Sequence, residues 1–232
     1  MKDLKNFSCV VILLAAGKSK RFNNKIKKQF LKLNGKTLVE YVFEKFAKLS
    51  YIKRFIVVVP KEDFKKINRI FEKKYNKLNF DIVIGGKERY DSVFNAGKYV
   101  DDETSCVIIH DVARPLVSLD LINRCVKEIE NYDCVIPAIK VYDTIKLINS
   151  NLEVVKTLDR EKLVLVQTPQ VLKTEVFKKV YSKKNLLRWT KKYKITDDAQ
   201  LVELQGYKVK VVAGDKNNIK ITTKDDLNFI YK

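Results

Sequence analysis

Residues 10–30 read VVILLAAGKSKRFNNKIKKQF, and their character changes half-way along. Residues 10–14 are five consecutive branched apolar residues, a run typical of a strand covered on both faces in a parallel sheet. Residues 15–17, Ala-Ala-Gly, add little side-chain bulk, so a ligand can approach the main chain and accept hydrogen bonds from backbone N–H groups. Arg21 and Lys28 bring positive charge to the same loop. The stretch predicts a phosphate-binding loop; the alternative is a tight turn followed by solvated lysines.

Outward from this stretch, short apolar runs alternate with amphipathic helical patterns. Strands are predicted at residues 54–59, 80–84, 105–109 and 134–139, and helices at residues 36–49, 61–75, 91–100 and 119–129. This alternation predicts an α/β fold with a doubly wound, mostly parallel sheet, in which ligands bind outside the carboxyl ends of the strands. The length suits a single domain over residues 1–232.

Polar segments follow three of the predicted strands: AAGKSKR at residues 15–21, GGKERYDS at 85–92 and HDVARP at 110–115. Because the carboxyl ends of parallel strands share one edge, we expect these three loops to converge. Asp111, just outside the sheet, is a candidate for chemistry, since its carboxylate can lie beside a divalent metal carried by a nucleotide. His110 is expected to be a packed residue at the strand end.

The alternation changes after residue 140. Two extended segments, residues 140–148 and 152–160, flank the polar turn NSN and predict a β-hairpin arm. The remaining predicted elements are a strand at residues 163–167, a helix at 173–182, a helix at 196–203 capped by Thr196, a strand at 208–212 and a closing helix that starts at residue 222.

The formal net charge of +19 and the pI near 9.6 raise the question of a nucleic-acid partner. The lysines are scattered over nearly every segment, however, whereas specific nucleic-acid readers cluster arginines. Residues 178–194 are the exception, with eight basic residues and no acid. We interpret them as a solvated helix–loop connection; the alternative is a surface that binds a single strand. Nucleic acid is therefore an unlikely partner on sequence grounds.

Several other classes are disfavoured. No apolar run approaches the ~20 residues of a membrane span, and the N-terminus lacks the apolar region of a signal peptide, so a cytoplasmic protein is expected. Four widely spaced cysteines without a CxxC pair are expected to be buried free thiols. The sequence has no GxG, no GxxxxGK[ST] and no GxSxG, which disfavours dinucleotide enzymes, P-loop hydrolases and serine hydrolases.

Eight ordered segments carry a resemblance to a known family: AAGKSKRF, KKQFL, GGKERYDSV, HDVARP, DTIK, TPQ, TDDA and NIKITTKDDL. In this order and spacing they resemble the 2-C-methyl-D-erythritol 4-phosphate cytidylyltransferases of the non-mevalonate isoprenoid pathway, over almost the whole chain. The first segment alone is shared by many nucleotidyltransferases. The resemblance implies a Rossmann-like nucleotidyltransferase fold and a reaction in which CTP and methylerythritol 4-phosphate give 4-diphosphocytidyl-2-C-methyl-D-erythritol and pyrophosphate, with Mg²⁺.

The resemblance also implies roles for individual residues. The implied catalytic cations are Arg21, Lys28 and Lys220. The implied nucleotide contacts are Ala15, Ala16, Gly17, Gly85, Gly86, Arg89, Ser92, Asp111 and Val112. Asp111 would also lie by the metal. The implied contacts to the sugar phosphate are Asp111, Arg114, Thr144 and Arg160. The last two lie on the arm, residues 140–160, which in similar proteins crosses to a second subunit and so implies a homodimer.

Some positions depart from the family pattern, and alternatives stay open. Phe22, Lys27, Lys87 and Val112 stand where methionine, proline, an acid and alanine are common, although none of these changes removes a cation. Arg160 and the neighbouring arm lysine, Lys146, could simply solubilise an exposed hairpin. A cytidylyltransferase for ribitol 5-phosphate is the nearest alternative, but such proteins tend to carry AGG and DTIV where this chain has AAG and DTIK. Lys18, Lys20, Lys25 and Lys27 are interpreted as background lysines.

Overall fold

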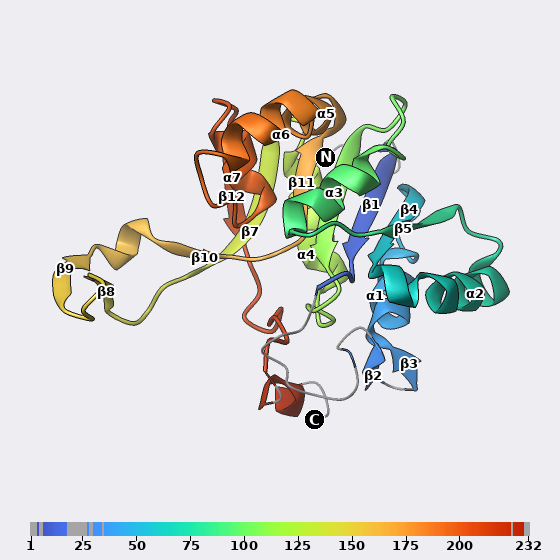
Figure 1. Ribbon diagram of the computed structural model, residues 1–232, viewed down its shortest axis with the longest axis horizontal. Coiled ribbons are helices and arrows are strands. Elements are labelled where there is room, and N and C mark those ends of the chain that lie inside the picture. Colours follow the sequence, from blue (N-terminus) through green and yellow to red (C-terminus); the bar gives the residue numbers. More distant parts are fainter. Residues whose placement is uncertain are drawn as a thin grey trace.

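A mixed sheet of eight strands forms the centre of the computed structural model, which describes residues 4, 7–17, 27, 30–33, 35–223 and 225–229 (Figure 1). Its strands are β1 (Cys9–Leu14), β4 (Ile52–Val59), β5 (Phe80–Ile84), β6 (Cys106–Asp111), β7 (Cys134–Lys140), β10 (Val164–Val166), β11 (Gln170–Lys173) and β12 (Val209–Ala213). Two further sheets have two strands each: β2 (Lys32–Leu33) with β3 (Lys36–Thr37), and β8 (Ile145–Ile148) with β9 (Val154–Leu158).

The strand order confirms the predicted fold class. The sheet runs β10-β7-β11-β6-β1-β4-β5, and β12 pairs with β7. β1 pairs in parallel with both β4 and β6, β4 with β5, and β12 with β7. β10 and β11 are antiparallel to their neighbours. The sequence analysis missed β11, because four residues that begin with glutamine and end with lysine carry no strand-length apolar run.

Helices cover both faces of the sheet (Figure 1). On one face lie α1 (Leu38–Phe46), α2 (Phe64–Tyr75) and α4 (Leu119–Glu128); on the other lie α3 (Arg89–Gly97), α5 (Thr174–Val180), α6 (Lys183–Thr190) and α7 (Asp198–Glu203). Successive residues of β1 alternate between the two apolar clusters, with Val11 and Leu13 in one and Val10 and Ile12 in the other. This double coverage is what the uninterrupted apolar run predicted.

Local capping moves several predicted helix boundaries. The helix predicted at residues 36–49 starts at Leu38, because Thr37 and Glu40 form a capping box there. The helix predicted to be capped by Thr196 is capped by Asp197 instead, whose side chain accepts a hydrogen bond from Gln200 N. Residues 178–194 contain a helix of their own, α6, rather than only a connection. The predicted closing helix is a short 3₁₀ segment, η5 (Asp225–Phe229).

The predicted β-hairpin arm is present as β8 and β9, which pair antiparallel. It extends to the side of the main sheet and is followed by a 3₁₀ turn, η4 (Arg160–Lys162) (Figure 1). Several large apolar side chains of the arm and its base are exposed: Tyr142, Leu147, Ile148, Leu152, Val154, Val155, Val164 and Leu165. The arm therefore contributes no core of its own.

All four cysteines are buried and free, as predicted. Burial raises the pKa of Cys125 to about 12, which keeps this thiol protonated. Within the described residues, no three His, Cys, Asp or Glu side chains gather in a way that could hold a metal ion. Over the same part of the chain, each helix is too short or too polar to cross a membrane.

Candidate active site

A cavity of about 290 Å³ lies at the carboxyl ends of β1, β4 and β5. It is lined by Ala16, Gly17, Lys27, Pro60, Lys61, Glu62, Gly85 and Gly86. Two of the three loops predicted to converge, those after β1 and β5, therefore meet here. A Cβ atom on Gly17 would meet no described atom within 4 Å, so the described packing leaves room on that side of the residue.

Both glycines after β5 are required by close contacts, Gly85 with the loop after β1 and Gly86 with the start of α3. A Cβ on Gly85 would lie 2.5 Å from the Cβ of Ala16, and a Cβ on Gly86 would lie 2.2 Å from the Cβ of Asp91. The Ser92 hydroxyl accepts a hydrogen bond from Gly86 N at 3.1 Å. Ser92 thus fixes the conformation of this turn, and its side chain is buried.

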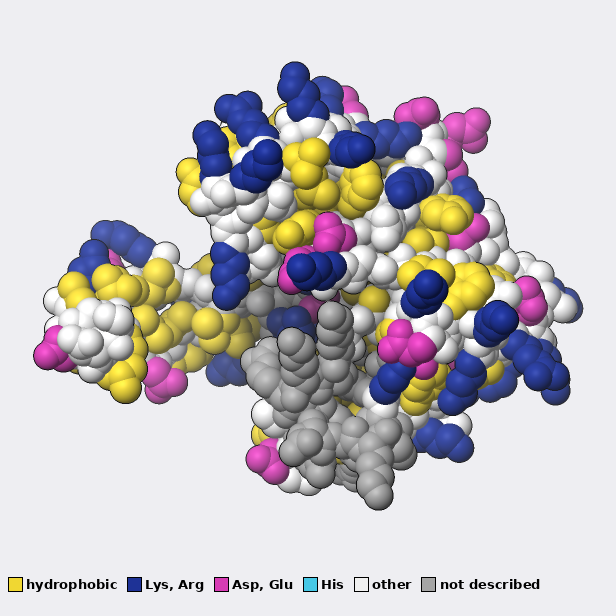
Figure 2. Space-filling model, in the orientation of Figure 1, with side chains coloured by type: hydrophobic (Ala, Val, Ile, Leu, Met, Phe, Trp, Pro, Cys, Tyr) yellow, Lys and Arg dark blue, Asp and Glu magenta, His cyan; other side chains and the backbone are white. Residues whose placement is uncertain are grey.

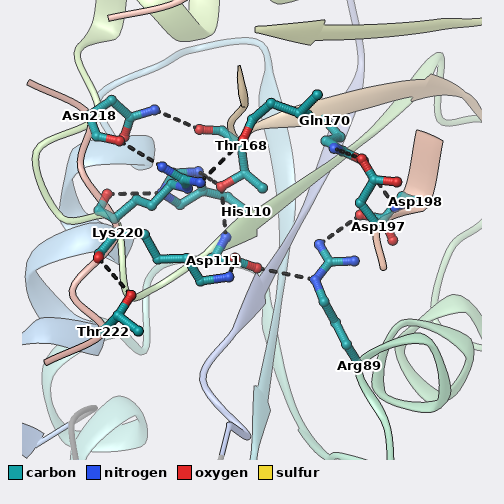
Figure 3. A network of polar contacts seen from close by, with 12 residues as sticks. Arg89, His110, Asp111, Thr168, Gln170, Asp197, Asp198, Asn218, Lys220 and Thr222 are labelled. Atoms are coloured by element: carbon teal, nitrogen blue, oxygen red, sulfur yellow. Dashed lines mark hydrogen bonds and ion pairs between the residues drawn. The ribbon is translucent and has the colours of Figure 1, made fainter. Parts of the chain in front are cut away.

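The third loop joins the first two through Asp111, whose side chain at the end of β6 lies between two cations (Figure 3). Lys220 Nζ lies 2.6 Å from Oδ2, and Arg89 Nε lies 3.3 Å from Oδ1. Burial alone would raise the pKa of this carboxyl, but the charges of Arg89 and Lys220 hold it well below its usual range. Asp111 is therefore ionised at neutral pH.

Arg89, at the start of α3, has a second acidic partner. Its Nη2 lies 2.7 Å from Oδ2 of Asp198, at the start of α7 (Figure 3). Burial would lower the pKa of Arg89, and the two carboxylates, Asp198 first and Asp111 second, raise it well above its ordinary value. Arg89 connects the loop after β5 to the end of β6 and to α7.

The segment after β12 is held beside the loop that follows β6. Arg114 Nη1 donates to the carbonyl oxygen of Asn218 at 2.8 Å, two residues before Lys220. Asn218 is fully buried. These contacts fix Lys220 next to Asp111 although 109 positions separate them in sequence. Burial lowers the pKa of Arg114, and its Nε has no partner among the described residues.

A family model described as "IspD: 2-C-methyl-D-erythritol 4-phosphate cytidylyltransferase" matches residues 9–230. The chain belongs to this family. A relative of that description from Thermosipho melanesiensis is 40% identical over 225 residues, 95% of each chain. One from Clostridium perfringens is 39% identical over 94% of this chain and 95% of its own. A crystal structure of 4-diphosphocytidyl-2C-methyl-D-erythritol synthase from Anaerococcus prevotii superposes with a TM-score of 0.82 at 30% identity, covering 97% of this chain and 96% of that one.

Membership of the IspD family agrees with the resemblance drawn from the ordered segments. Of the residues to which the resemblance gave roles, the structure brings Ala15, Ala16, Gly17, Gly85, Gly86, Arg89, Ser92, Asp111, Val112, Arg114 and Lys220 to one edge of the sheet. Val112 is 2% exposed and belongs to the apolar core, and its N–H donates to Leu14 O. Its side chain therefore packs in the core behind the site.

Two of the predicted residues, Thr144 and Arg160, are described and lie away from this cluster. Arg21 and Lys28 lie outside the described residues. Thr144 and Arg160 lie on the arm and are exposed; the Arg160 guanidinium donates to the carbonyl oxygen of Tyr142, also on the arm. Arg160 therefore contacts its own arm rather than Asp111 of the same chain.

The β10–β11 connection and the first residue of β11 supply two residues to which the sequence analysis assigned no role. Gln170 Oε1 accepts from the N–H groups of Asp198 and Ala199, both at 3.0 Å, and fixes the start of α7. Gln167 Nε2 donates to Asp215 O at 2.8 Å and so stabilises the turn before Lys220. The segment TPQ was noted as a family signature, but its backbone-fixing function follows only from the fold.

Lys27, interpreted above as a background lysine, has defined partners. Its Nζ lies 3.0 Å from Glu62 Oε1 and 2.8 Å from Asp63 Oδ2. Both acids lie in η3 (Lys61–Asp63), at the rim of the cavity. The lysine partly offsets two negative charges that would otherwise repel an anionic ligand.

His110, the single histidine, is fully buried and packs against Phe46, as predicted. Its Nε2 contacts Arg114 O at 3.2 Å and its Nδ1 contacts the Thr168 hydroxyl at 3.1 Å. The carbonyl oxygen of Arg114 can only accept, so Nε2 carries the proton of the neutral ring. Nδ1 is then an acceptor, and the Thr168 hydroxyl donates to it while its oxygen accepts from Asp111 N. Burial lowers the pKa of His110 to about 3.

We expect the His110 ring to remain neutral, protonated on Nε2, down to about pH 5. Because its folded pKa lies below the ordinary 6.5, the stability that neutral His110 contributes is present above pH 6.5 and is lost as the pH falls from there toward 3. Nitrogen-15 NMR of the one imidazole measures this directly. A ring that titrates with a midpoint near 6.5 would contradict the assignment.

Proposed function

We propose that the chain transfers the cytidylyl group of CTP to 2-C-methyl-D-erythritol 4-phosphate. A phosphate oxygen of the polyol substrate attacks the α-phosphorus of CTP, the bond to the β-phosphate oxygen breaks, and pyrophosphate leaves. The observation that carries the proposal is the cluster of Asp111, Lys220 and Arg89 at the same sheet edge as the glycine-lined cavity, in a chain of the IspD family. We expect the reaction in the cytoplasm, where cells keep their nucleoside triphosphates.

The chemistry requires cations more than a general base. Both reactants are anions, and negative charge accumulates on the oxygens around phosphorus as the bond forms. Lys220 is suited to this, because its side chain is 44% exposed and its ammonium already lies at an anionic oxygen, that of Asp111. An ammonium has three donors, so Lys220 can hold Asp111 and a phosphate oxygen at the same time. From sequence, Arg21 and Lys28 add charge to the loop after β1.

Mg²⁺ is expected to accompany CTP rather than to occupy a site made by the protein alone. Mg²⁺ usually binds through one or two carboxylates together with substrate phosphates. The donor set fits this mode, since Asp111 is a single ionised carboxylate at the edge and no described cluster offers three ligands. Bound there, the ion would neutralise charge on the triphosphate. Asp111 would hold it, and Lys220 and Arg89 would fix that carboxylate.

We also propose that the active unit is a dimer formed through the arm. The arm exposes Leu152, Tyr142 and Val154 by 78%, 64% and 60%, and Figure 2 shows hydrophobic side chains along it. Apolar surface of this kind is usually covered by a partner. A second copy is favoured, because a two-fold axis lets each arm reach the other subunit. Arg160 then brings a bidentate phosphate donor to the partner's site.

The test is pyrophosphate release by the purified full chain with CTP, Mg²⁺ and methylerythritol phosphate. We expect turnover, with ATP or ribitol 5-phosphate giving far slower release. No release with either alcohol phosphate would refute the transferase proposal. Faster release with ribitol phosphate would refute the narrower substrate assignment.

The nucleic-acid alternative makes a different prediction, namely steeply salt-dependent retention on DNA without pyrophosphate release. Lys and Arg side chains lie dispersed over the face drawn in Figure 2, including the region of α5 and α6. We expect weak, non-specific retention that disappears at moderate salt. Sequence-specific binding would favour the alternative.

A further inference from the structure

Asp198 is a fully buried carboxylate at the start of α7, and its ion pair is the shorter of the two that Arg89 makes. Arg89 Nη2 lies 2.7 Å from Asp198 Oδ2, whereas Arg89 Nε lies 3.3 Å from Asp111 Oδ1 (Figure 3). Asp198 is 0% exposed, and the Arg89 side chain is 27% exposed. The guanidinium is therefore anchored on Asp198 through Nη2 and reaches Asp111 with its Nε–H.

Asp198 is itself held from two other elements. The Tyr181 hydroxyl, at the end of α5, donates to Asp198 Oδ1. Gln170, from β11, accepts from Asp198 N at 3.0 Å. Tyr181 and Gln170 are 5% and 1% exposed, so these contacts are shielded from water. Low local dielectric strengthens hydrogen bonds within such a network, and its fixed partners leave Asp198 a single orientation.

Because Arg89 is shared with Asp198, it does not pair fully with Asp111. A guanidinium can grip one carboxylate with two donors when no competing carboxylate is present. With Asp198 fixed and paired with Arg89, Arg89 offers Asp111 one longer contact, and Asp111 Oδ2 accepts from Lys220 Nζ. Without the charge of Asp198, Arg89 is released to pair fully with Asp111 and to turn that carboxylate away from the nucleotide.

We propose that Asp198 is a positioning residue: it fixes Arg89, and through Arg89 it sets the orientation and availability of Asp111 in the nucleotide site. The proposal rests on the proposed function only in taking that site to bind CTP. Asp198 is not one of the described residues that line the cavity. It acts through its ion pair with Arg89, which joins the start of α7 to the start of α3.

The test is calorimetric binding of CTP with Mg²⁺ to Asp198→Asn. We expect the Kd for CTP to rise about 10-fold or more, in line with the loss of an outer partner behind a ligating carboxylate. The matched control is Glu40→Gln, because Glu40 is also a buried, ion-paired carboxylate, but its partners are Lys74 and Thr37 rather than Arg89. We expect Glu40→Gln to lower Tm while leaving the Kd for CTP at the wild-type value.

A double-mutant cycle separates positioning from general destabilisation. If Asp198 acts through Arg89, Asp198→Asn adds little to the rise in Kd already caused by Arg89→Met, whereas independent roles give multiplied effects. Tyr181→Phe, which removes one donor to Asp198 and keeps the ring packed on Phe177, provides a milder variant. It is expected to weaken CTP binding in the same direction, and it carries the test if Asp198→Asn does not fold.

The outcomes distinguish this inference from the proposed function. Wild-type affinity in Asp198→Asn or in Tyr181→Phe, or multiplied effects in the cycle, overturns the positioning role while cytidylyl transfer by the wild type stands. A wild type that binds CTP without releasing pyrophosphate overturns the transferase proposal, and the affinities still decide the role of Asp198. A wild type that binds no CTP overturns both.

Discussion

Replacing Lys220 with methionine will lower kcat for pyrophosphate release by about 100- to 1000-fold, the usual cost of removing one preorganised donor from a charge-stabilising site. Methionine keeps the length and apolar stem of the side chain but removes the ammonium that lies 2.6 Å from Asp111 Oδ2. Charge that develops around phosphorus then has one cation fewer. Steady-state turnover at saturating CTP measures the effect.

The matched control is Lys208→Met. Lys208 is exposed, and the hydrogen bond to Asp133 is made by its backbone, which the substitution retains. We expect this variant to turn over at the wild-type rate, with both proteins giving the same circular dichroism. A Lys220→Met protein within about three-fold of wild type would mean that the ammonium serves only to pair with Asp111, an effect of ordinary surface ion-pair size.

Mixing two inactive variants will restore activity if the arm serves the other subunit. Arg160→Ala is expected to be inactive through loss of the phosphate donor, and Lys220→Met through loss of the cation. In a mixed dimer, the body of the Arg160→Ala chain and the arm of the Lys220→Met chain together make one intact site. Random exchange then gives about a quarter of wild-type activity.

The measurement is pyrophosphate release after the two variants are incubated together, compared with each alone. The control mixes the Arg160→Ala protein with a Lys220→Met, Arg160→Ala double variant, which can assemble no intact site. Recovery in the first mixture and none in the control supports the arm exchange. If neither recovers although sedimentation shows mixed dimers, Arg160 acts within its own chain or not at all.

The fold and the position of the site could be predicted because they depend on strong, local signals. Five apolar residues in β1 require cover on both faces, and polar segments directly after strands must gather at one sheet edge. Asp111 was found in this way. Lys220 was not, because an isolated lysine in a chain of 47 basic residues has no distinguishing context; only its place in the NIKIT segment of a family signature singled it out.

Asp198 and β11 could not be predicted, for two different physical reasons. Asp197 and Asp198 are adjacent acids at the start of a six-residue helix: Asp197 caps it, and Asp198, its first residue, is buried. A helix of this length shows too little periodicity to predict which of the two acids is the N-cap and which is buried. β11 is a strand because β6 and β7 flank it, a tertiary condition that four residues cannot encode alone. The predictions for Arg21 and Lys28 stay predictions.

The insertion of β11 between β6 and β7 also sets an order in time. β6 ends at Asp111 and β7 ends at Lys140, yet the strand that separates them spans Gln170–Lys173. During synthesis, β1, β4, β5 and β6 can pair as a parallel unit well before β11 exists, because their contacts close earlier in the chain. β7 can pair with β11 only after the whole arm has been synthesised, because β11 follows the arm in the chain. The nascent protein therefore passes through a stage in which one edge of β6 is unpaired, and the late closure of this long loop is the step that we expect to limit folding.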